Sequence, residues 1–318
     1  MKAGPIAVLE PMSGEMQARV REICGDLELR FPRSGDPTDF IPIIGDVPYV
    51  VTRGLRFPAE VLDRAHEVKL IHQWGTGVDG IPLDAARERN ITVLRSPGVN
   101  APTVADLTLA LMLAALRRLP QTAAHFRAGN WEVPDLWKQS RDLCEARVGL
   151  VGMGAIGQAV ANRLDGFGSG IVYTRRSGPL AGSAHRFVDL DELLETSDVV
   201  SLHLPLTVDN RHLIGARELR LMQADSLIVN TSRGALIDEA ALIAALRGGQ
   251  IGSAALDVFE NEPVADNNPL LSMDNVITLP HVAGRTRDNL TRMVRHWAGN
   301  IRAHAAGEPI AESCIVLP

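Results

Sequence analysis

One segment, VGLVGMGAIG at residues 148–157, restricts the fold more than any other part of this 318-residue sequence. An apolar, strand-like run leads into glycines at 152, 154 and 157, and the helical pattern AIGQAVANRL follows. Glycines at this spacing let backbone amides and the positive end of a helix face a pyrophosphate without obstruction by side chains. The motif alone can be a plain tight turn, but its position between a strand and a helix predicts a dinucleotide-binding unit.

Strand-like and helical patterns alternate twice along the chain, first over about the first hundred residues and again from Arg147. In the first series Ser13 is placed to cap a helix, and Pro58 and Pro82 suit first helical turns. This alternation predicts an α/β protein with two doubly wound parallel sheets. A last amphipathic helix, near 286–305, precedes IVLP, which we expect to return to the first domain. The strands expected in the first series span residues 6–9, 27–31, 48–52, 69–72 and 91–94.

Composition excludes several classes of protein. The formal charge is −6, and no run of Lys or Arg is longer than a pair, which disfavours nucleic acid and acidic membranes as partners. Cys24, Cys144 and Cys314 are odd in number and widely spaced, so they support neither a disulfide framework nor a metal site. The N-terminal segment lacks an apolar signal core, and no stretch approaches the roughly 20 apolar residues of a membrane span. We therefore expect a cytoplasmic protein.

Three chemically active residues follow three apolar runs in the second series. Arg233 comes after SLIVN, Glu262 after SAALDVF and His281 after VITL. The carboxyl ends of parallel strands share one edge of a sheet, so these side chains are expected to meet there. Arginine can hold an anionic substrate and polarise its carbonyl, and histidine can exchange a proton near neutral pH while a carboxylate orients its ring. The alternatives are a solvated arginine and a histidine satisfied within the core.

Two further features concern the cofactor. After the strand GIVYT, where an NAD site would place an acidic residue, the chain has Thr174, Arg175, Arg176 and Ser177. Two guanidiniums and two hydroxyls suit a 2′-phosphate, so we expect NADP(H) to be preferred, with NAD(H) as the weaker option. The alternative is a solvated basic turn. Asp257 is expected to face the nicotinamide amide, and the alternative is a buried polar residue inside the strand.

The segment APTVADLTLALMLAALRRL, residues 101–119, is apolar on nearly every face. It is expected to form one helix that lies between domains or across a subunit interface.

At this point the motifs carry a family resemblance. The segments GTGVDGIPLDAARERNITVLRSPGVNAPTVAD, VGMGAIG, LHLPLT, NTSRGALID, ALDVFENEP and LPHVAG resemble, in order and spacing, the D-isomer-specific 2-hydroxyacid dehydrogenases from about residue 48 onward. The resemblance implies a Rossmann dinucleotide-binding domain at 100–284, inserted into a flavodoxin-like substrate domain made of 1–99 and 285–318. It also implies catalysis by Arg233, Glu262 and His281, and a homodimer formed through the long apolar helix.

Further site residues are assigned with this resemblance. The loop Gly75–Asp79 is expected to bind a substrate carboxylate through backbone amides, since glycines allow close approach. The expected substrate contacts are Gly75, Thr76, Gly77, Val78, Arg53 and Asn100. The expected cofactor contacts are Gly152, Met153, Gly154, Ala155, Ile156, Gly157, Thr174, Arg175, Arg176, Ser177, Leu204, Pro205, Thr231, Ser232, Asp257 and Gly284.

The chain departs from the family pattern at several positions. Thr174 replaces the acidic residue of NAD members, which points toward the glyoxylate and hydroxypyruvate reductase branch. Asp106 stands where glutamate is common, Trp74 adds bulk beside the carboxylate loop, and Arg285 follows HVAG where a small residue is frequent. Glu262 is not the glutamine of formate dehydrogenases, which disfavours formate oxidation.

The expected function is an NADPH-preferring reduction of a small 2-oxo acid, such as glyoxylate or hydroxypyruvate, to a D-2-hydroxy acid. One alternative is an NAD-dependent enzyme for a bulkier oxo acid. The other is a nucleotide-sensing binding protein similar to transcriptional corepressors, because a fold alone does not fix an activity.

Overall fold

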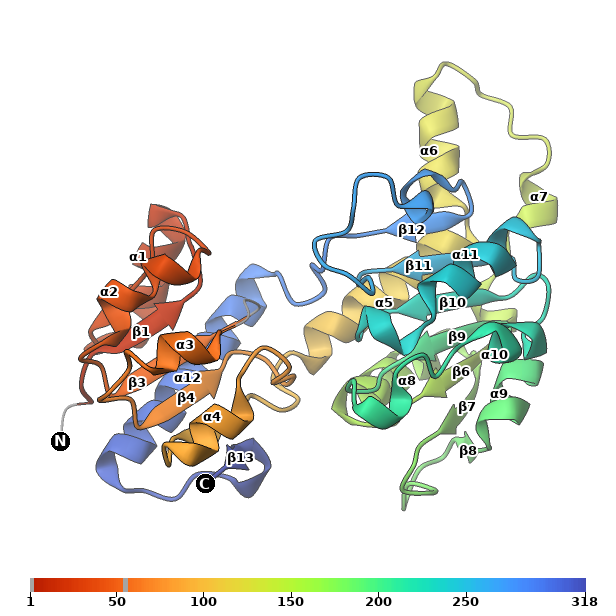
Figure 1. Cartoon of the computed structure of the whole chain (residues 1–318). Coiled ribbons are helices and arrows are strands. Elements are labelled where there is room, and N and C mark those ends of the chain that lie inside the picture. The colour runs from red at the N-terminus through yellow and green to blue at the C-terminus, as the bar shows by residue number, and fades with distance from the viewer. Residues whose placement is uncertain (1–2, 54–56) are drawn as a thin grey trace. The chain divides into compact units, whose positions relative to one another are not determined.

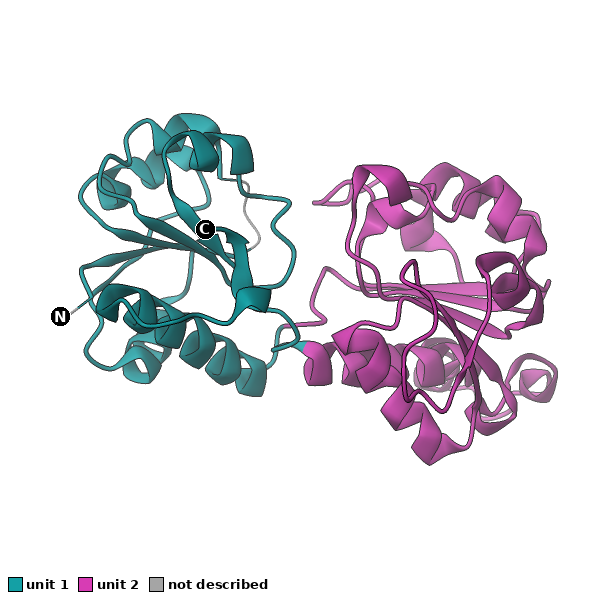
Figure 2. Cartoon of the chain, turned by 90° about the horizontal axis from the view of Figure 1, so that it is seen from below, with its two compact units in different colours: residues 1–100, 285–318 teal, residues 101–284 magenta. Residues whose placement is uncertain are grey.

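The computed structural model describes residues 3–53 and 57–318. The chain divides into two compact units, shown in different colours in Figure 2. The first unit contains residues 1–100 and 285–318, and the second contains residues 101–284. Asn100, which the predicted boundary assigned to the dinucleotide-binding domain, falls in the first of these units.

The first unit is built on a sheet with the order β13-β5-β4-β3-β1-β2. Its five N-terminal strands are parallel, and their order, 2-1-3-4-5 in chain sequence, is that of flavodoxin-like folds. β13 pairs antiparallel with β5, which confirms that IVLP returns to this domain. The strands are β1 Ile6–Leu9, β2 Leu29–Arg30, β3 Tyr49–Thr52, β4 Leu70–Gln73, β5 Thr92–Leu94 and β13 Ile315–Leu317.

Helices cover both faces of this sheet. α1 and α12 pack on one face, around the fully buried Trp297. α2, α3 and α4 pack on the other face. Ser13 caps α1 as predicted, since its hydroxyl accepts a hydrogen bond from the Met16 amide at 3.2 Å. The helices are α1 Gly14–Cys24, α2 Ile41–Ile44, α3 Ala59–Leu62, α4 Leu83–Glu88 and α12 Arg287–Ala306, with short 3₁₀ turns η1 Pro37–Asp39 and η6 Glu312–Cys314.

The second unit contains a fully parallel sheet with the order β12-β11-β10-β9-β6-β7-β8. Numbered within the unit, this is 3-2-1-4-5-6-7, the Rossmann order with one added strand. The prediction of two doubly wound sheets is therefore confirmed. The strands are β6 Arg147–Val151, β7 Gly170–Thr174, β8 Arg186–Phe187, β9 Val199–Leu202, β10 Leu227–Asn230, β11 Ser253–Leu256 and β12 Val276–Thr278.

The second sheet also carries a helical layer on each face (Figure 1). α5 and α8 share one apolar cluster with the sheet, and α9, α10 and α11 share the other. The helices are α5 Ala101–Leu116, α6 Leu119–Arg127, α7 Leu136–Gln139, α8 Ala155–Phe167, α9 Leu190–Thr196, α10 Ala216–Leu221 and α11 Glu239–Arg247, with 3₁₀ turns η2 Leu143–Glu145, η3 Val208–Asn210, η4 Gly234–Leu236 and η5 Pro269–Ser272.

The prediction of a single helix over 101–119 was wrong at its C-terminal end. α5 stops at Leu116, and Arg118 has a left-handed backbone with φ of 52° before α6 begins. Pro120 suits the first turn of the new helix but disfavours continuation of the old one. Most of the apolar side chains of α5 are buried within the second unit itself, and the exposed Asp106 pairs with Arg163 of α8 at 2.6 Å. Among the described residues, no helix has the length and apolar character needed to span a membrane.

Candidate active site

Arg233, Glu262 and His281 all belong to the second unit and follow three neighbouring strands. β10, β11 and β12 lie side by side in the sheet, and each of the three residues comes in the segment after one of their carboxyl ends. The structure thus delivers the three side chains to the edge of the sheet where the sequence predicted them, because parallel strands end together.

His281 and Glu262 form a hydrogen-bonded pair. The distance from His281 Nδ1 to Glu262 Oε2 is 2.7 Å, and the other carboxylate oxygen accepts the Phe259 amide at 3.1 Å. Nδ1 therefore carries the proton that it donates to the carboxylate, and Nε2 is the ring nitrogen that remains for other chemistry. The side chain of His281 is 48% exposed, so a small molecule can reach the ring.

The electrostatics bring Arg233 into the same group. Burial raises the pKa of the Glu262 carboxyl, but the hydrogen bond from His281 and the positive charges of His281 and Arg233 outweigh it, so the net pKa is below its usual range. Glu262 is consequently a carboxylate at neutral pH, and it senses the Arg233 charge as well as the imidazole. The charges of Arg233 and His281 thus both act on the Glu262 carboxylate.

The loop that carries Arg233 is held by contacts of its neighbours. Asn230 donates from its side chain to the Arg233 carbonyl at 2.9 Å, and its side-chain oxygen accepts the Ser232 amide at 3.0 Å. Gly234 follows, and a Cβ built there would lie 1.9 Å from the Phe259 carbonyl carbon. Only glycine allows this approach, which packs the arginine loop against the segment that leads to Glu262.

Asp257 holds the backbone of the histidine loop. This fully buried residue accepts three backbone amides, at 2.8 Å each: His281 on its carbonyl, and Val282 and Ala283 on its two carboxylate oxygens. His281 itself has a left-handed backbone with φ of 52°, a conformation unfavourable for a residue with a side chain. Each carboxylate oxygen thus accepts one backbone amide, and a carboxylate has about four acceptor positions, so a contact to the nicotinamide amide stays a prediction. Burial raises the pKa of this carboxyl.

The glycine segment forms a turn without Cβ atoms at positions 152 and 154, directly before α8. Gly152 has φ of 105°, and a Cβ there would lie 2.6 Å from the His203 carbonyl oxygen. A Cβ at Gly157 would lie 2.2 Å from the Gly152 carbonyl oxygen, whereas one at Gly154 would meet nothing within 4 Å. Gly154 is the N-cap of α8 and supplies no side-chain cap. The first-turn amides at Ala155 and beyond therefore face an open approach, which fits a pyrophosphate.

The other predicted cofactor contacts fall into two groups. Met153 is buried beneath the glycine turn, Ile156 lies in the first turn of α8, and Leu204 would touch any Cβ at Gly152, at 2.9 Å. Pro205 follows Leu204, and Gly284 is the last residue of the unit. The hydroxyls of Thr231 and Ser232 are used inside the protein, by Thr108 at 3.0 Å and by the Leu202 carbonyl at 2.5 Å respectively.

The basic turn follows β7 beside the glycine turn. The Thr174 carbonyl accepts the Gly152 amide at 2.9 Å, which joins the two segments. Arg175 donates from Nε to the Ser177 hydroxyl at 2.7 Å, and Arg176 is exposed. Within the described part of the chain, neither arginine has a carboxylate partner. A phosphate would therefore meet guanidiniums that no acidic side chain already neutralises.

The predicted substrate contacts lie in the first unit. Gly75, Thr76, Gly77 and Val78 follow β4 and are partly buried, and the loop is fixed by Thr76 donating to the Ser96 carbonyl at 3.1 Å. Arg53 follows β3, and its carbonyl accepts the Gln73 side chain at 2.7 Å. Asn100 is the last residue of this unit before the chain enters the second unit at Ala101. Its side-chain oxygen is buried and has no hydrogen-bond partner among the described residues.

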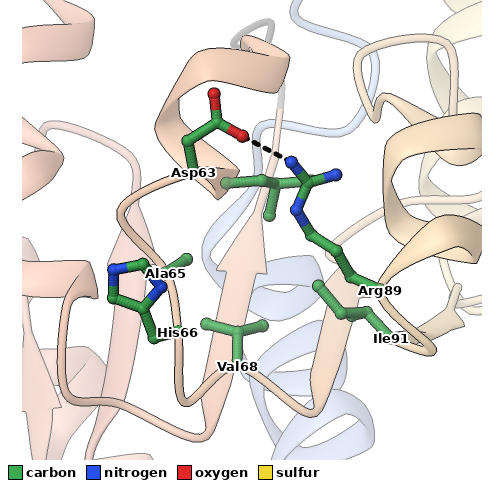
Figure 3. A pocket seen from close by; sticks show the side chains of 7 residues that line it. Asp63, Ala65, His66, Val68, Arg89 and Ile91 are labelled. Carbon is green, nitrogen blue, oxygen red and sulfur yellow. Dashed lines mark hydrogen bonds and ion pairs between the residues drawn. The ribbon is translucent and has the colours of Figure 1, made fainter.

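A cavity in the first unit lies away from these residues. Its volume is about 360 Å³, and Figure 3 shows Asp63 and Arg89 joined by an ion pair across it. Val68 and Ile91, which line it, precede β4 and β5, so the cavity lies at the amino ends of these strands. The Gly75 loop lies at the opposite, carboxyl edge. Across residues 3–53 and 57–318, no three His, Cys, Asp or Glu side chains are grouped as a metal site would need, and the three cysteines are free.

Comparison with known proteins places the chain in a family. Residues 109–283 match the D-isomer specific 2-hydroxyacid dehydrogenase, NAD binding domain. A glyoxylate reductase of Korarchaeum cryptofilum is 40% identical over 79% of this chain and 77% of its own length. A D-3-phosphoglycerate dehydrogenase of Methanocaldococcus jannaschii is 36% identical over 98% of this chain, which spans 59% of that relative.

A solved structure agrees with this placement over the whole chain. It is an NADPH-dependent glyoxylate/hydroxypyruvate reductase of Sinorhizobium meliloti in complex with NADP and malonate, with a TM-score of 0.84 and 30% identity, and the match covers 100% of this chain and 99% of that one. The resemblance inferred from the sequence motifs is thereby confirmed. The chain belongs to the D-isomer-specific 2-hydroxyacid dehydrogenases and is an oxidoreductase with an NAD(P)-binding domain.

Proposed function

We propose that this protein is an NADPH-preferring reductase of small 2-oxo acids, such as glyoxylate or hydroxypyruvate, that forms D-2-hydroxy acids. The observation that carries the proposal is the 2.7 Å pair of His281 and Glu262, at a sheet edge that also carries Arg233. The names of similar proteins support the substrate class, because a glyoxylate reductase and a glyoxylate/hydroxypyruvate reductase are among them.

The roles of the three residues follow from their chemistry. NADPH, when bound, supplies the hydride that the carbonyl carbon needs. His281 is the acid that delivers a proton from Nε2 to the carbonyl oxygen, while Glu262 holds the ring through Nδ1. Arg233 stabilises the negative charge that develops on that oxygen and binds the substrate carboxylate. Asp257 positions His281 through the backbone and does not itself touch the substrate.

The preference for NADPH is inferred from the basic turn at 174–177. Thr174 stands where an NAD enzyme would have a carboxylate for the ribose hydroxyls, and Arg175 and Arg176 follow it. A carboxylate would repel the 2′-phosphate, whereas two guanidiniums without acidic partners attract it. The serine that Arg175 already contacts adds a hydroxyl at the same place.

A substrate panel tests the function directly. The purified protein is assayed for NADPH and NADH consumption with glyoxylate, hydroxypyruvate, pyruvate and phenylpyruvate, and the stereochemistry of the product is determined. We expect the highest kcat/KM for a small oxo acid with NADPH, and a D-hydroxy acid as product. A clear preference for phenylpyruvate with NADH would instead support the NAD-dependent alternative. Tight nucleotide binding without turnover of any oxo acid would support the corepressor-like alternative.

We also propose that the protein is a homodimer. Figure 1 shows α6 and the segment toward α7 extending from the sheet of the second unit, and this segment exposes Trp131 and Trp137 by 80% and 76%. Large aromatic side chains at this exposure typically mark protein contacts. Light scattering should give twice the 34.3 kDa chain mass, and the W131S and W137S double variant should shift it toward the monomer. A monomeric wild-type protein at micromolar concentration would contradict this proposal.

A further inference from the structure

Glu260 lies close to the proposed catalytic carboxylate in the chain, between Phe259 and the segment that carries Glu262. Its side chain is only 18% exposed. It belongs to one of three segments that follow β9, β10 and β11, which are neighbours in the sheet (Figure 1). Parallel neighbours end at the same edge, so these segments lie together where the catalytic residues are expected.

The Glu260 carboxylate is bound by the segment that follows β9. Arg211 and His212 both donate to its Oε1, and the His212 Nε2 lies 2.8 Å away. His212 has a left-handed backbone with φ of 55°, a conformation unfavourable for a residue with a side chain. The His212 amide donates to the Ala235 carbonyl at 2.8 Å, which joins this segment to the one that carries Arg233. Two donors from a fixed segment therefore hold the carboxylate.

The Glu260 backbone is held by the segment that follows β10. Its amide donates to Glu239 Oε2 at 3.1 Å, and Glu239 Oε1 accepts the Asn268 side chain at 2.7 Å. Glu239 is the first residue of α11, so the end of a helix anchors this amide. The close packing of Gly234 on the Phe259 carbonyl fixes the preceding residue as well. Residues 259 and 260 are thus held through side chain, amide and packing.

Glu262 depends on this held segment. Its Oε1 accepts the Phe259 amide at 3.1 Å, and its Oε2 accepts from His281 Nδ1 at 2.7 Å. The carboxylate therefore connects its own loop to the imidazole, and a shift of the loop changes the geometry of the pair. Hydrogen bonds weaken steeply as their length and angle depart from the optimum, so a small shift is enough to disturb the pair.

We propose that Glu260 is a positioning residue, which holds the 259–262 segment so that the Glu262 carboxylate stays aligned with the His281 ring. Glu239 supports it from the backbone side. This inference rests on the proposed function, because it concerns the proton donor of that reaction. Glu260 acts through Glu262 and not on the substrate.

The kinetics of E260A test this role. The kcat for reduction of the best oxo acid should fall about ten- to hundredfold, with KM for NADPH within about threefold of the wild type, since a misaligned acid slows the chemical step and not binding. The pH at which kcat/KM for reduction falls to half should also move down by about one unit, because a displaced carboxylate favours the protonated ring less. The charges of Arg233 and Asp257 act on the same pair, and E260A leaves both in place.

E218A is the matched control. Glu218 belongs to the same unit, is 17% exposed and pairs with Arg217 at 2.9 Å, but it lies in α10 and not in the 259–262 segment. E218A should leave kcat and the pH profile unchanged. E260Q keeps an oxygen that accepts hydrogen bonds, and it should recover most of the kcat lost in E260A. Equal changes of the pH profile in E218A and E260A would overturn the proposal, as would an E260A profile identical with that of the wild type.

A double-variant cycle shows whether Glu260 acts through Glu262. In an E262A background, E260A should cost less than about twofold in kcat, because no carboxylate remains to be positioned. Losses that multiply would overturn the proposal. If E260A does not fold, H212N takes its place in the cycle, since asparagine suits the left-handed backbone but shortens the donor to Glu260. H212N should show the same changes at a smaller size.

The outcomes separate this inference from the proposed function. If an oxo acid is reduced and E260A behaves like E218A, the positioning role is wrong and the function stands. If no oxo acid is reduced, the function is wrong, and an NMR titration of the His281 ring, assigned with H281N, still tests the role. E260A should then move the titration midpoint in the same direction as E262Q. A midpoint that E262Q moves and E260A leaves in place would overturn the proposal.

Discussion

Removal of the two guanidiniums that follow β7 should abolish most of the preference for NADPH over NADH. In R175A/R176A the adenosine 2′-phosphate would lose two charge-assisted hydrogen bonds, each worth about 1.5 to 3 kcal/mol. Arg176 is exposed and Arg175 only partly buried, so solvent screening favours the lower end of that range. The sum, about 3 kcal/mol, corresponds to about two orders of magnitude in kcat/KM for NADPH.

The assay compares kcat/KM for NADPH and NADH in the wild type and the variants. The double variant should lose NADPH turnover steeply while NADH turnover hardly changes, and adding T174D should turn the preference toward NADH. R186A is the matched control, since Arg186 lies on the adjacent strand β8 and is already paired with Glu192. It should leave the ratio intact. A wild-type enzyme that uses both cofactors equally well would refute the reasoning and make the arginines a solvated turn.

Three further outcomes are expected. H281A should lower kcat by about two to four orders of magnitude. The affinity for NADPH, measured by fluorescence titration, should stay unchanged. A kcat close to that of the wild type would show that His281 is not the acid. The methyl ester of the best oxo acid should be a very poor substrate, because the Arg233 cation would be left unpaired. R233K should be a poor enzyme, because an ammonium cannot form the two parallel hydrogen bonds of a guanidinium. Equal kcat/KM for the acid and its ester would show that the carboxylate does not anchor the substrate. Burial lowers the pKa of His72 to about 3 and of His203 to about 4. In the folded protein each histidine therefore stays neutral, whereas in the unfolded chain it gains a proton below pH about 6.5. The contribution of each histidine to the free energy of unfolding should be fully present above that pH. Below it, the free energy of unfolding should fall by about 1.4 kcal/mol per histidine and pH unit, until the pKa of the folded state is reached. Thermal unfolding midpoints that do not change between pH about 7 and about 4 would contradict this.

The sequence predicted the sheets well because apolar runs bounded by turn residues define parallel strands locally. The run expected at 69–72 is β4 at Leu70–Gln73, and the one expected at 27–31 shortens to the edge strand Leu29–Arg30. The end of α5 was less predictable. Its apolar pattern continues past Leu116, and the break depends on the left-handed Arg118 and the start of a separate helix.

The candidate site was predictable where it depends on strand ends, and less so where it depends on tertiary contacts. The order of β10, β11 and β12 is enough to group Arg233, Glu262 and His281. The backbone clamp of Asp257 is different, because no local pattern shows that its carboxylate meets the amides of Val282 and Ala283. The packing of Trp74 on Trp297 likewise joins distant parts of the sequence. In the sequence, Trp74 stands out only as a departure from the family pattern.

The position of the Asp257 clamp along the chain has a mechanical consequence. The chain passes from the second unit back to the first between Gly284 and Arg285, and only Val282–Gly284 separates His281 from that crossing. Asp257 fixes the amides of Val282 and Ala283 through its carboxylate and the His281 amide through its carbonyl. The last residues before the boundary are therefore anchored to the sheet of the second unit, at the end of β11. The left-handed backbone of His281 is thus fixed by contacts within its own unit.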